Sequence, residues 1–300
     1  KRDWRIFADF AQVLIAQATR QYAGEPMGVE LEGAAYALDS TTVDLCLGLF
    51  PWAKYKQTRG GVKMHTLLAL RGNLPSLVVI TPAHVHDVNV LAELAFEPGA
   101  LYVMDRGYVD FAQFRRIHQA PAFFLTRAKR NLKFRRRTSA PVDKTAGVRF
   151  DQTGVLAEPT SRRRYPDTLR RVGYRDPETG QPLVFLTNNS VLSAPDVAQL
   201  YRRRWQIELF FRWIKQHLRI KAFYGTSPNA VKIQIWIAIC VYVLGAILRK
   251  RLGLSCSLYA ILQILSVTLF EKTPILQTLS SVPRADLQAE LGNQLYLQGI

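Results

Sequence analysis

Apolar side chains recur at the spacings of helices and strands through the first 126 residues. The residues between Phe7 and Ala18 follow a helical period and predict a short packing helix. Three β-rich apolar runs, each bounded by glycine, proline or charge, then predict strands over 36–49, 62–70 and 74–81. Their connections are short, so we expect consecutive antiparallel pairing.

Helices and strands alternate in the next part of the chain. Asp87 is placed to cap a helix that runs to about residue 95, and LYVMD at 101–105 predicts a fourth strand. A helical period over 111–117 precedes a fifth apolar run at 122–126. Three strands, a helix, a strand, a helix and a strand predict an α/β fold with a mixed sheet flanked by helices.

The pattern changes after residue 126. Turn signals such as DPETGQP and short β-like runs at 168–174 and 183–187 predict a β-rich insertion. An S-x-x-D step at Ser193 then begins a long helix that runs to about Leu218. A strongly apolar helix follows at 233–248. Its 16 residues fall short of the roughly 20 that cross a bilayer, which favours a buried core helix over a membrane span.

These changes in pattern predict five segments. They are an N-terminal helical segment (1–30), a first core part (31–126), a β-rich basic insertion (127–192), a second core part (193–250) and a C-terminal helical segment (251–300). The first residue is lysine, and we expect an upstream segment to be missing. Three scattered cysteines support neither a zinc module nor a disulfide framework, and they favour a reducing compartment.

The net charge of +17 points to a polyanionic partner. Most of the 40 cations are arginine, whose planar guanidinium suits bidentate phosphate contacts, so nucleic acid is favoured over a membrane surface. Two arginine-rich clusters lie in the insertion, at 127–137 and 161–171, interleaved with aromatic residues. A charged surface that serves only solubility is the alternative.

A stripe of polar groups runs along the predicted helix at 193–218. At 100° per residue, Tyr201, Arg204, Glu208 and Lys215 lie within an arc of about 60°, beside an apolar face. One carboxylate among cations and a phenol, next to buried surface, is typical of a metal or phosphate site. A surface salt-bridge ladder is the alternative, because Arg204 and Glu208 are i,i+4 partners.

Two strand aspartates favour the metal hypothesis. Asp39 lies on the first predicted strand and Asp105 at the end of the fourth, where a buried carboxylate needs a partner or a metal. Two such aspartates and Glu208 supply the hard oxygen ligands that Mg²⁺ prefers in phosphoryl chemistry. Two rival carboxylates fit less well: Asp44 falls on the opposite strand face, and Asp110 is placed to cap a helix.

The segment at 201–218 resembles the DDE transposases of bacterial insertion sequences, specifically the IS4-like group. Tyr201, Arg204, Glu208 and Lys215 match that group's tyrosine, arginine, glutamate and lysine at the same spacing. LDST around Asp39 and VMDRGY around the second aspartate resemble the contexts of the family's catalytic aspartates.

The resemblance implies a ribonuclease-H-like fold with the insertion before the glutamate helix. It assigns catalysis and the binding of two Mg²⁺ ions, for which Mn²⁺ can substitute, to Asp39, Asp105 and Glu208. It implies cleavage at element ends and strand transfer into target DNA. Tyr201, Arg204 and Lys215 are then expected to hold DNA phosphates.

Further DNA contacts are expected from two sources. Trp205 is a candidate for stacking on a displaced base, with packing as the alternative; the insertion contains no tryptophan, so Phe134, Tyr165 or Tyr174 would serve there. The arginine clusters are expected to contact DNA through Arg135, Arg136, Arg137, Arg162, Arg163 and Arg164. His84 and His86 are expected on one strand face, where a place near the metal competes with simple capping and loop structure.

The partners that follow are the element ends and target DNA, both double-stranded, and a second copy of the chain in a homodimer, for which the segment after Leu252 is a candidate. We expect no membrane partner and a cytoplasmic location at the bacterial nucleoid. Two alternatives stay open: a DNA-binding relative that no longer cuts, and a nuclease of the same fold that hydrolyses DNA without joining it.

Overall fold

The computed structural model describes residues 2–217 and 223–268. The chain divides into two compact units: Glu25–Arg212 forms one, and Lys1–Gly24 with the chain from Trp213 onward forms the other. Each unit is described by itself.

One sheet organises the unit Glu25–Arg212, and within the described residues it has ten strands in the order β2-β3-β1-β5-β6-β10-β9-β8-β7, with β4 paired to β3. The strands are β1 (Ala35–Leu45), β2 (Lys54–Lys56), β3 (Arg59–Ala69), β4 (Leu74–Pro82), β5 (Leu101–Met104), β6 (Phe123–Arg127), β7 (Phe134–Ala140), β8 (Val148–Leu156), β9 (Leu169–Arg175) and β10 (Pro182–Thr187).

The first half of this sheet is mixed, as the apolar runs predict. β3 pairs antiparallel with both β1 and β4, whereas β1, β5 and β6 run parallel. All four residues of β5 are buried, because helices on both sides leave a parallel strand no solvated face. This arrangement confirms the predicted mixed α/β fold.

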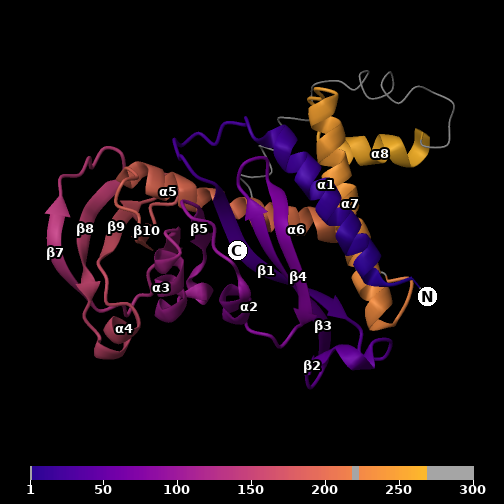
Figure 1. The fold of residues 1–300 in the computed structure, drawn as a ribbon, viewed down its shortest axis with the longest axis horizontal. Coiled ribbons are helices and arrows are strands. Elements are labelled where there is room, and N and C mark those ends of the chain that lie inside the picture. The colour runs from indigo at the N-terminus through magenta and orange to yellow at the C-terminus, as the bar shows by residue number, and fades with distance from the viewer. Residues whose placement is uncertain (1, 218–222, 269–300) are drawn as a thin grey trace. The chain divides into compact units, whose positions relative to one another are not determined.

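The insertion continues the same sheet instead of forming a separate layer. β10 pairs antiparallel with β6, and β9, β8 and β7 follow outward in turn, as the left side of Figure 1 shows. The runs predicted at 168–174 and 183–187 are confirmed as β9 and β10. The strand β7 was not predicted, because FRRRTSA is a polar edge strand whose residues after Phe134 are all exposed. Charge on an edge strand protects it from pairing with another chain.

Helices and short turns of this unit pack against the sheet. They are the 3-10 turns η1 (Pro51–Ala53) and η2 (Arg106–Tyr108), and the helices α2 (Asp87–Glu93), α3 (Phe111–Gln119), α4 (Pro159–Arg164), α5 (Ala194–Arg203) and α6 (Trp205–His217), which extends beyond the unit boundary. The core lies between β1, β5, β6 and the helices α2 and α3, where Leu38, Tyr102, Phe114 and Phe124 are buried. Even-numbered residues of β1 therefore face this core.

The second unit is helical. α1 (Trp4–Tyr22) lies along α7 (Pro228–Arg251), and α8 (Leu258–Thr268) follows (Figure 1). The Tyr22 hydroxyl donates to the Ala246 carbonyl oxygen at 2.9 Å, and Asn229 accepts from the Trp4 amide at 3.0 Å. By length and composition α7 is apolar enough to cross a membrane, but 61% of its most apolar window is buried in the protein, as in a core helix. Most of the segment proposed for dimer contact, 269–300, lies outside the described residues.

The predicted helix over 193–218 is wrong in one respect. The chain breaks at Arg204, between α5 and α6, because the Arg204 amide bonds back only three residues, to the Tyr201 carbonyl at 3.1 Å. No glycine or proline marks this break in the sequence RRRWQ, so the amphipathic pattern runs through it. The first predicted strand also ends early, at Leu45, where a turn replaces the expected residues up to 49.

A buried ion pair ties the insertion to the segment that leads into α5. Arg170 on β9 forms a bidentate pair with Asp151 on β8, at 2.9 and 2.6 Å, and their side chains are only 10% and 12% exposed. The same guanidinium donates to the carbonyl oxygens of Asn189 and Leu192, just before Ser193 caps α5. Arg170 thus fixes the chain that delivers the glutamate helix.

We expect Arg170→Met to lower the free energy of unfolding by about 3–5 kcal/mol, because it leaves Asp151 buried without its partner. Urea unfolding followed by circular dichroism measures this loss. Arg175→Met is the matched control, an exposed arginine on the same strand, and should change stability by less than about 0.5 kcal/mol. Equal effects of the two substitutions would contradict a structural role for the pair.

Candidate active site

Strand register brings Asp39 and Asp105 together. β1 and β5 pair in parallel up to Leu38 and Met104, so the residue that follows the paired segment is an aspartate in both, Asp39 within β1 and Asp105 directly after β5. Adjacent strands are about 4.8 Å apart, which makes the two carboxylates neighbours. Asp105 is one of the charges that raise the pKa of Asp39, in agreement with this proximity.

The turn after β5 orients Asp105. Its carboxylate accepts a hydrogen bond from the Gly107 amide at 2.7 Å and thereby caps η2. Its backbone carbonyl oxygen accepts a second bond, from the Thr126 hydroxyl on β6, at 3.0 Å. Gly107 matters here because a Cβ at that position would lie 3.0 Å from the Asp105 carboxylate.

Arg204 links the strand carboxylate to the helix carboxylate. One guanidinium nitrogen bonds Asp39 at 2.9 Å and another bonds Glu208 at 2.7 Å. The three side chains are 15%, 20% and 32% exposed, respectively. Because Arg204 sits at the break between α5 and α6, this bridge fixes the start of α6 against the middle of β1.

Burial disfavours the ionised form of the Asp39 carboxylate, and the positive charge of Arg204 only partly offsets this effect. Burial raises the pKa of Asp39 to about 6, although the Ser40 amide and the Arg204 guanidinium favour its ionised form; Asp105 and Glu208 raise the pKa further. An additional cation at this position would stabilise the carboxylate. The pKa shift therefore marks Asp39 as a candidate metal ligand or proton-exchanging group.

The donor chemistry fits a hard divalent cation, since three carboxylates supply only oxygen ligands. Among the described residues, no three acidic, histidine or cysteine side chains stand close enough to hold an ion as they are placed. Arg204 instead provides the positive charge between Asp39 and Glu208.

The other residues of the predicted stripe follow α5 and α6. The Arg204 guanidinium carbon lies over the Tyr201 ring, 5.9 Å from the ring centroid. The rings of Tyr201 and Phe185 pack with their centroids 4.9 Å apart. Burial raises the pKa of Tyr201, so the phenol is neutral and able to donate. Trp205, the first residue of α6, is 40% exposed, and Lys215 lies two turns beyond Glu208 on the same helix.

All six predicted arginines of the insertion are exposed. Arg135, Arg136 and Arg137 lie on the edge strand β7, while Arg162, Arg163 and Arg164 form the last turn of α4. Arg171, the last residue of the second arginine-rich cluster, is not among the predicted contacts; its guanidinium stacks between Phe134 at 4.7 Å and Phe150 at 5.0 Å.

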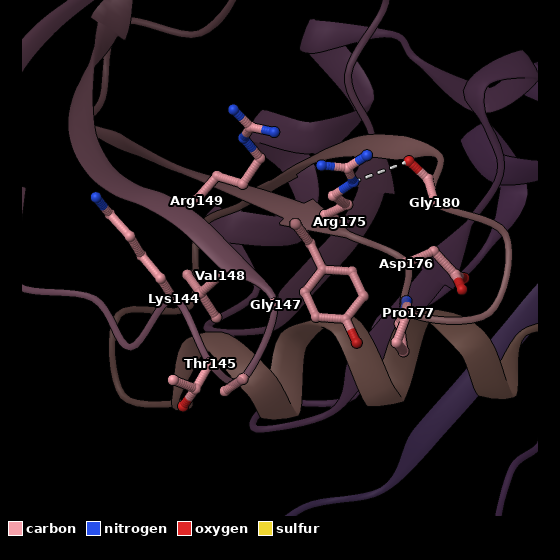
Figure 2. A pocket seen from close by; sticks show the side chains of 11 residues that line it. Lys144, Thr145, Gly147, Val148, Arg149, Arg175, Asp176, Pro177 and Gly180 are labelled. Carbon is pink, nitrogen blue, oxygen red and sulfur yellow. Dashed lines mark hydrogen bonds between the residues drawn. The ribbon is translucent and has the colours of Figure 1, made fainter.

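The aromatic candidates of the insertion differ in accessibility. Tyr165 is fully buried, with its hydroxyl 2.7 Å from His118 Nδ1, so the prediction that it offers a stacking surface is wrong. Phe134 is half-buried and carries Arg171 on its ring. Tyr174 is half-buried and lines a hollow of about 940 Å³ together with Lys144, Arg149 and Arg175 (Figure 2).

Two carboxylates and two histidines are further candidates for the site, and the structure places them at an exposed strand position, in a helix cap and in a turn. Asp44 is exposed, and Asp110 caps α3 through the amides of Ala112 and Gln113. His84 and His86 are exposed in the turn after β4, so the expectation that they share a strand face is wrong. α2 begins at Asp87, directly after His86, and the turn at residues 83–86 has no strand period to align the two rings.

Comparisons with known proteins identify the family of this chain. Residues 31–244 match the model of the transposase DDE domain. The inferred transposase y4zB of Sinorhizobium fredii is 34% identical over 280 residues, which cover 92% of this chain and 76% of that protein. The chain therefore belongs to the DDE transposase family, whose members are generally enzymes that act on DNA and typically use divalent metals.

Other relatives place the chain near insertion-sequence transposases and confirm the IS4-like resemblance. An inferred transposase of element IS5377 from Geobacillus stearothermophilus is 34% identical over 69% of this chain and 54% of its own length. An inferred transposase of element IS4SA from Synechocystis is 24% identical over 81% of this chain and 68% of its own length. A piggyBac transposase synaptic complex with hairpin DNA, solved by cryo-EM, aligns with a TM-score of 0.48 and 11% identity, over 89% of this chain and 58% of that chain.

The pKa of Asp39 predicts how stability depends on pH in chelator. An aspartate with its ordinary pKa of 3.8 when unfolded and about 6 when folded favours folding below pH 3.8, and loses that contribution as the pH rises through 6. We expect Asp39→Asn to gain stability relative to the parent between pH 4 and pH 7, by up to about 3 kcal/mol. Urea unfolding at both pH values measures the change, with Asp44→Asn as the control.

A difference between parent and Asp39→Asn that does not vary with pH would contradict the raised pKa. The Asp44→Asn curve should run parallel to that of the parent, because its carboxylate is exposed.

Proposed function

We propose that this protein is a cut-and-paste transposase that cleaves DNA at the ends of an insertion sequence and joins the freed 3′ ends to target DNA. The observation that carries this proposal is that Asp39 and Asp105 directly follow the paired segment of β1 and β5, with Glu208 tied to Asp39 through Arg204. Membership of the DDE family and the relatives of insertion-sequence elements support it.

Asp39, Asp105 and Glu208 are the proposed catalytic residues and the ligands of two Mg²⁺ ions, with Mn²⁺ as a substitute. When bound, such ions activate an attacking oxygen and stabilise a leaving oxygen in phosphodiester chemistry. Asp39 and Asp105 hold one edge of the site on rigid strands, whereas Glu208 reaches it from a helix. The ionised carboxylates are required for ligation, so acid pH should oppose it.

Tyr201, Arg204 and Lys215 are the proposed phosphate contacts near the scissile bond. The Arg204 guanidinium has five N–H donors, of which the carboxylate bonds use two, so donors remain for a phosphate. Tyr201 offers a neutral hydroxyl, and Trp205 offers an exposed indole for a displaced base.

The exposed arginines of β7 and α4 supply sequence-independent contacts to duplex DNA in this proposal. The DNA complex contains two copies of the chain, because joining two element ends needs two active sites. The proposed location is the bacterial cytoplasm, at the nucleoid where the DNA substrate lies.

The decisive test combines a 3′-hydroxyl-ended element-end duplex and a supercoiled plasmid with the protein, in Mg²⁺ or in chelator. We expect Mg²⁺-dependent joined product, visible as slower-migrating labelled plasmid. Glu208→Gln should reduce joining by at least about 10³-fold, because it removes a charged ligand and retains the side-chain size. Asp44→Asn, with an exposed carboxylate on the same strand as Asp39, should join at the parental rate.

The same assay distinguishes the alternatives. Nicked or linear plasmid without joined product would identify a nuclease of this fold. DNA binding with neither product, and no effect of Glu208→Gln, would identify a DNA-binding relative that has lost catalysis.

The arginines of α4 should set part of the salt dependence of DNA binding. Replacing Arg162, Arg163 and Arg164 together with glutamine should flatten the slope of log K against log salt by about 2 to 3, if each contacts a phosphate. Fluorescence anisotropy of a labelled duplex at several salt concentrations measures the slope. Arg115→Gln, an exposed arginine on α3 outside both clusters, should leave it unchanged, and an unchanged slope in the triple variant would exclude α4 from the interface.

A further inference from the structure

A second carboxylate lies behind Asp39, on the opposite face of β1. Successive residues of a strand point to opposite faces, so Ser40 faces the core while Asp39 faces Arg204. The Ser40 hydroxyl donates to the Asp87 carboxylate at 2.6 Å, and the Ser40 amide bonds the Asp39 carboxylate at 2.8 Å. One residue therefore connects the two acids.

The prediction that Asp87 caps its helix is wrong, because α2 begins at Asp87 with His86 in the cap position.

Asp87 also gathers two cationic or polar groups from the neighbouring strand β3. Lys63 Nζ lies 3.2 Å from the carboxylate and donates to the Val85 carbonyl oxygen at 2.7 Å. His65 Nδ1 lies 3.5 Å from the same carboxylate oxygen, and its Nε2 is 2.9 Å from the Thr81 hydroxyl. His65 is 1% exposed and pairs directly with Ser40 in the register of β1 and β3.

This arrangement ties three elements to one carboxylate. Ser40 brings β1, Lys63 and His65 bring β3, and Asp87 itself opens α2. α2 in turn packs against η2, the turn that Asp105 caps. Burial raises the pKa of Tyr108 in η2, and the charges of Asp87 and Asp39 raise it further. The cluster thus spans the backbone that carries both strand aspartates.

We propose that Asp87 is a positioning residue of the active site, which acts through Ser40 to hold the Asp39 carboxylate in place for metal binding. The inference rests on the proposed function, because it assumes that Asp39 is a ligand. Asp87 itself touches no reacting atom; its effect passes through one hydroxyl and one backbone amide. Residues that orient a ligand in this way typically alter metal affinity 10- to 100-fold when they are replaced.

The test measures Mn²⁺ binding directly, by the loss of the free-ion electron paramagnetic resonance signal, on the protein without DNA. Asp87→Ala and Ser40→Ala should each weaken Mn²⁺ binding by about tenfold or more. Asp87→Asn retains an oxygen that accepts from Ser40, so it should lose less affinity than Asp87→Ala. The double variant Ser40→Ala/Asp87→Ala should bind as weakly as the weaker single variant, because the two residues act in series.

Two controls separate this inference from the proposed function and from folding. Asp44→Asn should bind Mn²⁺ as the parent does, and Glu208→Gln should bind more weakly. A parent protein that binds no Mn²⁺, or binding unaffected by Glu208→Gln, would overturn the proposed metal site itself. Parental affinity in folded Ser40→Ala and Asp87→Ala, or additive losses in the double variant, would overturn only the positioning role. If Asp87→Ala does not fold, Ser40→Ala decides, because it leaves the Asp87 pair with Lys63 intact.

Discussion

The bridge that Arg204 makes between Asp39 and Glu208 is the interaction on which the rest of the site depends. It joins a carboxylate on β1 to one on a helix 169 positions later in the chain, and it lies at the break between α5 and α6. Two acids so close would repel each other strongly without a cation between them. The guanidinium thus lets the carboxylates approach, and its remaining donors still suit a phosphate.

The insertion is joined to the rest of the unit through the shared sheet. β10 returns beside β6, so the insertion's four strands extend the core sheet and share its twist. Arg170, held by Asp151, also bonds the loop before α5, the helix that leads into α6 and Glu208.

Polar contacts on both faces of β1 hold the strand at Asp39 and Ser40. Asp39 faces Arg204, and Ser40 faces the cluster around Asp87, so the backbone between them is held from two sides. Such double support restricts the carboxylate to a narrow range of positions, which metal-dependent chemistry requires. The raised pKa of Asp39 shows the energetic consequence, because a buried acid kept in place for a ligand is poorly solvated without one.

The sequence by itself determined the mixed sheet, because the apolar runs of β1, β3, β4, β5 and β6 bury enough surface to override local ambiguity. It also singled out the candidate acids, since Asp39 and Asp105 follow apolar strand residues and Glu208 keeps its spacing from Tyr201, Arg204 and Lys215. Only the tertiary structure decided the edge strand β7, the break at Arg204 and the role of Asp87. Each depends on partners distant in sequence: β7 on pairing with β8, Arg204 on Asp39, and Asp87 on Ser40, Lys63 and His65. Local periodicity carries no information about such contacts, because a charged or polar residue has the same pattern whether it faces water or a buried partner.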